Sequence, residues 1–115
     1  MAYFRCYQQA VRRTFVIDVI DPERIKEARA ILEDRETSKI HVRGTVIKEF
    51  RTYNWPWSWH LDPRSIDFFE YAAEVCDASV VLLEKRLRDV GGGFLPHNVW
   101  CPWNSRVIEE VELES

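Results

Sequence analysis

Three closely spaced tryptophans are the residues of this sequence best suited to contact a ligand. They are Trp55, Trp57 and Trp59, at a strict spacing of two. Because alternate residues of a β-strand face the same side, a strand here places the three indoles together. Indole is large and unfavourable to leave in water. This face is therefore either the centre of the core or an aromatic platform for a sugar, a base, a cation or a proline-rich peptide.

A second aromatic segment lies where the sequence predicts a loop. Residues 94 to 104 contain two prolines and follow three consecutive glycines, a composition typical of irregular structure. We expect this loop to fold back over the tryptophan strand, with the ligand site between them. Indoles would supply contact area there, and polar or charged side chains would supply specificity. The predicted ligand-binding residues are Trp57, Trp59, His60, His97, Trp100, Trp103 and Arg106.

Histidine and cysteine side chains offer a second chemistry, that of a metal site. His97 and Cys101 stand four positions apart, a spacing that tetrahedral zinc sites use. The other half of a zinc site would have to come from His60 and Cys76, which form no recognised ligand pair. The spaced Asp and Asn residues of an EF-hand loop are absent from the sequence. Metal binding, of calcium or zinc, therefore stands as an alternative, and the sequence identifies no cofactor.

The same side chains would also suit nucleophilic catalysis. A cysteine beside a histidine can form a reactive thiolate, so Cys101 with His97, or Cys76 with His60, would make such a pair. Neither pair lies in a recognised hydrolase motif, and no G-x-S-x-G segment is present. We therefore interpret the protein as a non-enzymatic module that binds a protein or a small molecule. A small Cys/His enzyme is the alternative.

Composition favours a soluble globular protein of one domain. The 115 residues are 46% hydrophobic and 30% charged. The net charge of -3 argues against nucleic-acid binding, which needs a basic surface. No apolar run reaches the length of about 20 residues that crosses a bilayer, so we expect no membrane partner.

The N-terminus and the cysteines bear on the compartment. The first residues lack the charged and apolar regions of a signal peptide, which predicts a cytoplasmic location. Three cysteines, an odd number, do not indicate a disulfide framework. We expect a single domain over residues 1–115, with its ordered core at residues 13–113.

The hydrophobic pattern predicts an α+β fold, in which an antiparallel sheet of about four strands has two helices packed on one face. A strand at residues 55 to 61 containing Pro56 would lie at an edge, where a second copy could pair, so a homodimer is an alternative. Asp-Pro pairs predict both helix starts, and three glycines predict the end of the second helix. The strands are expected at residues 13 to 20, 39 to 50, 55 to 61 and 106 to 113, and the helices at residues 22 to 34 and 63 to 90, with a break in the second near residues 74 to 77.

Several short segments together resemble one family of small domains. The family is sometimes labelled calmodulin-related or calcium-related, and it also occurs as an N-terminal domain of larger proteins. The resemblance spans residues 13 to 111 and supplies no catalytic residue. The segments that carry it are Tyr53-Asn54, Trp57-Ser58-Trp59-His60-Leu61-Asp62-Pro63, Ser65-Ile66, Phe68-Phe69-Glu70, Glu74-Val75-Cys76-Asp77-Ala78, Gly91-Gly92, Phe94-Leu95-Pro96, Trp100-Cys101-Pro102-Trp103 and Ser105-Arg106.

Overall fold

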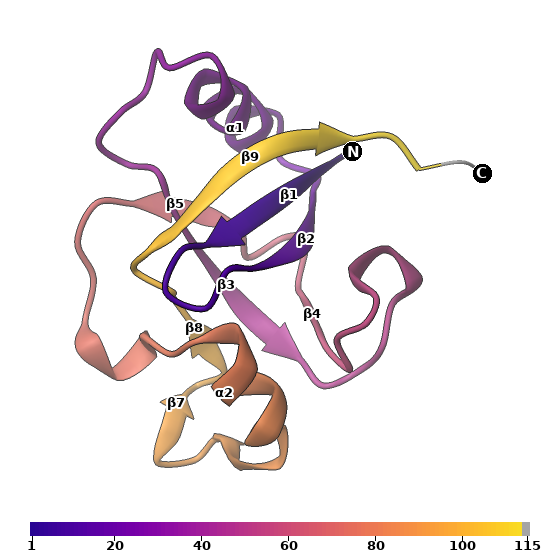
Figure 1. Cartoon of the computed structure of the whole chain (residues 1–115), viewed down its shortest axis with the longest axis vertical. Helices are drawn as coiled ribbons and strands as arrows, with labels where there is room; N and C mark the ends of the chain where they lie inside the picture. Colours follow the sequence, from indigo (N-terminus) through magenta and orange to yellow (C-terminus); the bar gives the residue numbers. More distant parts are fainter. Residues whose placement is uncertain (114–115) are drawn as a thin grey trace.

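A three-stranded antiparallel sheet brings the two ends of the chain together. The structure is a computed structural model, which describes residues 1–113. The first strand is central and pairs with the second strand on one side and with the last strand on the other. The three strands are β1 (Ala2–Gln8), β2 (Arg13–Val19) and β9 (Ser105–Val111). Figure 1 shows β1 and β9 side by side, with the N-terminus near the end of β9.

The strand β3 (His41–Ile47) organises the second sheet, because three short strands pair with it. All three pairings are antiparallel. Gly44 lies opposite Trp100, and a Cβ atom on this glycine would stand 3.0 Å from Cδ1 of Leu61. The missing side chain therefore allows close packing at the centre of β3. The partner strands are β4 (His60–Leu61), β5 (Asp67–Phe69) and β8 (Val99–Trp100), and a separate parallel pair joins β6 (Val90–Gly91) to β7 (Phe94–Pro96).

The longer helix, α1 (Pro22–Leu32), begins where the sequence predicts it. The Asp21 carboxylate accepts a hydrogen bond of 2.9 Å from the backbone N–H of Glu23, and Pro22 occupies the first turn. Figure 1 shows α1 beside β9. No helix within residues 1–113 has the length and apolar character to cross a membrane. The remaining helical elements are η1 (Thr52–Asn54), η2 (Glu74–Cys76), α2 (Val80–Lys85) and η3 (Leu87–Asp89).

The predicted fold class is wrong. We expected one antiparallel sheet of about four strands with two helices on one face. Residues 1–113 instead form nine strands in three sheets, and α2 has only six residues. The strand β1 was not predicted, and the strand expected at residues 55 to 61 is present only at His60–Leu61.

The helix expected at residues 63 to 90 accounts for most of this difference. Its apolar residues recur at spacings of three and four, yet each is buried by a separate contact. Phe68 and Phe69 belong to a strand that pairs with β3, and Cys76 is bonded to Cys101. Only residues 80 to 85 are α-helical, after Ser79 accepts a hydrogen bond of 3.0 Å from the N–H of Leu82. Helical spacing therefore did not specify a continuous helix in this segment.

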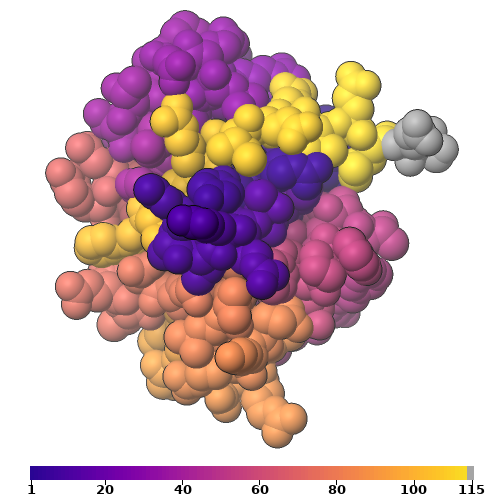
Figure 2. Space-filling model, viewed as in Figure 1, coloured from indigo at the N-terminus to yellow at the C-terminus, as the bar shows by residue number. Residues whose placement is uncertain are grey.

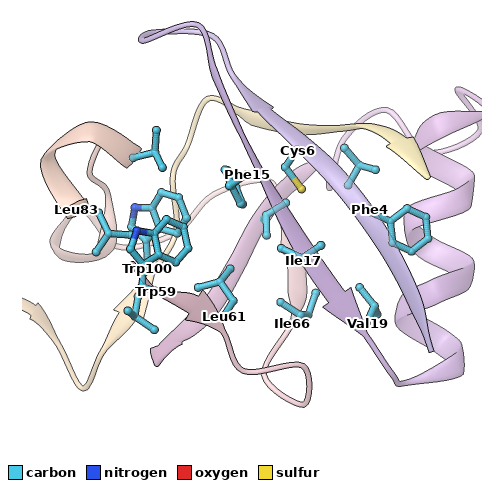
Figure 3. Packing of buried hydrophobic residues seen from close by; sticks show 14 of the residues in the cluster. Phe4, Cys6, Phe15, Ile17, Val19, Trp59, Leu61, Ile66, Leu83 and Trp100 are labelled. Carbon is cyan, nitrogen blue, oxygen red and sulfur yellow. The ribbon is translucent and has the colours of Figure 1, made fainter. Parts of the chain in front are cut away.

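One hydrophobic core fills the space between the two larger sheets and α1. Phe4, Ile17 and Val19 face Leu61 and Ile66 in one part of it, whereas two buried indoles pack against Leu83 at the other end (Figure 3). The segment that follows β5 runs along one edge of the molecule, seen in Figures 1 and 2, and leads to η2. A second, smaller cluster around Phe69 and the disulfide lies there.

Candidate functional site

The structure places three of the four predicted site tryptophans in the core. Trp59 and Trp100 are fully buried, with their rings edge-to-face and 5.1 Å apart. Trp57 is also buried, and its indole N–H donates a hydrogen bond of 2.8 Å to the carbonyl oxygen of Thr14. The indole N–H of Trp100 donates a hydrogen bond of 2.9 Å to the carbonyl oxygen of Ala78. These indoles therefore have structural partners and leave little surface for a ligand.

The other predicted site residues are scattered. Trp103 is half-buried and packs against the small cluster at the disulfide. Arg106 is exposed, and its guanidinium forms an ion pair of 2.7 Å with Asp34. His60 and His97 line two different pockets that share no lining residue. The seven residues thus do not converge on one site, and their role in ligand binding remains a prediction.

One of the two pockets is an apolar groove beside η2, with a volume of about 280 Å³. The loop predicted to cover the tryptophan strand forms one wall, and the segment after β5 forms the other. We name it the Tyr71 groove. The lining residues used below are Arg43, Phe69, Tyr71, Val75, His97 and Val99.

Two side chains of this groove are unusually exposed for their chemistry. Tyr71 is 81% exposed and Val75 is 67% exposed. They stand beside Phe69, which is buried, so the apolar surface extends from the core to the solvent. Adjacent exposed apolar side chains of this kind mark sites of association more often than isolated ones do.

The Cys76–Cys101 disulfide fixes the two walls of the groove relative to each other. The two Cα atoms are 5.1 Å apart, within the range that a disulfide requires. In addition, the backbone N–H of Cys101 donates a hydrogen bond of 2.7 Å to the carbonyl oxygen of Cys76. The expectation that the cysteines form no disulfide is therefore corrected. Neither sulfur is a free thiolate in this state, which removes the basis of the predicted zinc set and of both catalytic pairs.

The loop that carries His97 is held to β3 by its neighbour. The backbone N–H of Val46 donates to the carbonyl oxygen of Asn98 at 2.8 Å, and the Asn98 amide donates to the carbonyl oxygen of Val46 at 3.1 Å. Both His97 and Asn98 have positive φ, at 61° and 64°. This tight turn holds His97 at the mouth of the groove, where it is exposed.

The charges at the groove are cationic. Arg43 lies on β3, is exposed, and takes part in none of the ion pairs of residues 1–113. His97 adds a second group that carries positive charge when protonated. The arrangement provides an apolar surface with a cationic rim. Within the described part of the chain, no three His, Cys, Asp or Glu side chains converge to hold a metal ion.

Sequence reasoning missed most of the groove. Tyr71 and Val75 fell within the predicted helix of residues 63 to 90, where exposed side chains are ordinary. The available signal was the segment Glu70 to Asp77 itself, in which apolar residues alternate with small and acidic ones without a clear period. A reading as irregular structure would have left Tyr71 and Val75 on a loop, where binding residues are frequent.

These features define a small β-rich domain with a disulfide-bridged apolar groove. The chain belongs to the BP-74 N-terminal domain family, whose model matches residues 1–114. This confirms the expected membership of a small domain family that occurs at the N-terminus of larger proteins, whereas the calmodulin-related label finds no support in the match. Searches of curated proteins and of solved structures gave no match.

Proposed function

We propose that this domain is a non-enzymatic binding module that takes up an apolar segment of a partner protein in the Tyr71 groove. The supporting observation is the exposure of Tyr71 and Val75 at the mouth of an apolar groove. Burial of apolar surface contributes about 25 cal/mol per Å², so covering these two side chains would supply a useful part of a binding energy. Tyrosine is also among the residues that dominate interfaces.

The charge of the groove favours an acidic partner segment. The Arg43 guanidinium is exposed and unpaired within residues 1–113, and His97 stands at the same rim. A carboxylate of the partner would gain a charge-assisted hydrogen bond from Arg43. The occupant we propose is therefore a protein segment with a large apolar side chain close to an Asp or Glu.

The disulfide bears on where such binding takes place. Disulfides persist in oxidising compartments and are rare in the cytosol. The Cys76–Cys101 bridge, which forms part of the groove wall, therefore supports action outside the reducing cytosol rather than the cytoplasmic location expected from the sequence.

Selection from a random-peptide library displayed on phage tests the proposal. Enriched peptides should carry an aromatic or branched aliphatic residue near an Asp or Glu. Val75→Ser should weaken their binding about tenfold, equivalent to about 1.4 kcal/mol. Arg43→Gln should weaken binding and reduce its dependence on salt.

Trp55→Ser is the matched control, because Trp55 is an apolar side chain that is 75% exposed and lies outside the groove. This variant should bind the peptides as the wild type does. The proposal is wrong if no peptide is enriched, or if Val75→Ser binds as tightly as Trp55→Ser. Sedimentation of the two variants distinguishes a second copy of this chain as occupant, since a dimer lost only in Val75→Ser would replace the partner segment.

A further inference from the structure

Asp18 is a buried carboxylate without a partner. It lies in β2, its residue is only 7% exposed, and its Oδ1 atom accepts no hydrogen bond within residues 1–113. Burial raises the pKa of Asp18 above its ordinary value, because the charged form has lost solvation. An unpartnered carboxylate of this kind weakens a fold, and such local conflicts concentrate at functional sites.

Asp18 lines a pocket of about 350 Å³, which we name the Asp18 pocket. Apolar walls come from Ile20, Ile47 and Pro63. None of the residues that line it also lines the Tyr71 groove, so the two sites are separate. The pocket combines a carboxylate with room for a small organic molecule.

The hydroxyl of Tyr53 is a second unpartnered group in this pocket. It is buried and makes no hydrogen bond within the described residues. The Tyr53 ring lies 5.2 Å from the ring of Tyr3 and 6.2 Å from that of His60, between centroids. Burial, followed by the negative charge of Asp18, raises the pKa of Tyr53, so its hydroxyl stays neutral. A neutral hydroxyl can both donate and accept.

His60 supplies a third polar atom, and its hydrogen bonding fixes its tautomer. Its Nδ1 atom lies 2.8 Å from the backbone carbonyl oxygen of Glu49. Because a carbonyl oxygen only accepts, Nδ1 must carry the proton and donate it. In the neutral ring, Nε2 is then an acceptor. His60 is buried and lines the pocket, which places this acceptor in the same wall as Asp18 and Tyr53.

We propose that the Asp18 pocket binds the ammonium group of a small organic amine, which donates hydrogen bonds to the Asp18 carboxylate, the Tyr53 hydroxyl and Nε2 of His60. An ammonium group carries three donors and one positive charge, which matches three acceptors and one negative charge. The faces of the tyrosine rings favour a cation further. A metal ion fits less well, because no group of three or more His, Cys, Asp or Glu ligands exists within residues 1–113.

The charged groups at the pocket suggest which amine it is. Arg51 forms an ion pair with Glu49 at 3.4 Å, whereas Arg64 forms no ion pair within residues 1–113. The Asp62 carboxylate, also at the pocket, accepts a hydrogen bond of 3.0 Å from the backbone N–H of Arg64. The Arg64 guanidinium therefore remains available for an anionic group on the same ligand. A zwitterion such as a free amino acid satisfies both ends.

Chemical-shift titration with n-butylammonium, and with butyrate as the anionic control, tests the proposal. Butylammonium should bind and butyrate should not. Asp18→Asn should weaken the binding of butylammonium at least about tenfold while the free protein stays folded and no less stable, since only an unpartnered charge is lost. Asp89→Asn is the matched control, because Asp89 is exposed and pairs only with Arg86, and it should bind normally.

The remaining arms separate the source of the ligand and the site. Norleucine should bind more tightly than butylammonium, and Arg64→Gln should remove that difference; equal affinities would overturn the zwitterion as ligand. Val75→Ser should bind butylammonium as the wild type does, which separates this site from the Tyr71 groove. Absence of butylammonium binding, or equal binding to Asp18→Asn, would overturn the proposal.

Discussion

The Oδ1 atom of Asn54 accepts a hydrogen bond of 2.8 Å from the backbone N–H of Val16. The Asn54 amide also donates a hydrogen bond of 2.9 Å to the carbonyl oxygen of Trp59. Asn54 is fully buried, so this side chain joins the strand β2 to the tryptophan segment inside the core. It satisfies two backbone groups that have no water available.

Replacement of Asn54 by alanine should destabilise the fold by about 3 kcal/mol, because it leaves a buried N–H and a buried carbonyl without partners. The free energy of unfolding, measured by urea denaturation, checks this value. Asn104→Ala is the control, since Asn104 is exposed and the change should stay within about 0.5 kcal/mol. Equal stability of the two variants would show that Asn54 does not join these segments.

Trp57→Phe should lower the free energy of unfolding by about 1–2 kcal/mol. The change removes the donor to the Thr14 carbonyl oxygen and part of a buried ring. Trp55→Phe should have no measurable effect, because Trp55 is exposed. A larger loss in Trp55→Phe than in Trp57→Phe would contradict the assignment of Trp57 to the core.

The period of the tryptophan segment was informative, but its interpretation as one strand was not. Trp57 and Trp59 do reach the core, whereas Trp55 faces solvent. Sequence alone could predict that the indoles were either core or platform. The decision rests on hydrogen bonds to Thr14, Ala78 and other distant backbone groups, which no local pattern encodes.

Strands and helices with strong local signals were predicted correctly. The Asp21-Pro22 start of α1 and the β-branched residues of β2 match the structure. The segment after Asp62-Pro63 has the same start signal without a helix, because Ser65 donates its backbone N–H to the Asp62 carbonyl oxygen in a turn and the chain then pairs with β3. Tertiary pairing overrode local propensity there.

The state of the cysteines gives an independent test of the groove. Without reductant, the native protein should show no accessible thiol, and the denatured protein should show one, from buried Cys6. Cys76→Ala with Cys101→Ala should lower the free energy of unfolding by about 3 kcal/mol, the scale for a bridge with a sequence separation of 25. Thiol titration and denaturation measure the two effects. Three thiols in the unreduced, denatured chain would contradict the bridge.

The pH dependence of stability tests the environment of Asp18. Its pKa is raised by burial, so the folded state holds its proton to higher pH than the unfolded state does. Stability from this group therefore falls as pH rises through the window between the unfolded value of about 3.9 and the raised folded value. Asp18→Asn should remove that fall and raise the free energy of unfolding at neutral pH by about 1 kcal/mol. An unchanged pH profile would show that Asp18 is solvated.

The central claim is that partners bind at the Tyr71 groove and not at the buried indoles. Titration of ¹⁵N-labelled protein with a peptide enriched in the selection above tests it most directly. The backbone amide signals of Tyr71, Val75 and Val99 should shift, while the indole N–H signals of Trp57, Trp59 and Trp100 should stay in place. Shifts of those indole signals without shifts at the groove amides would contradict the account.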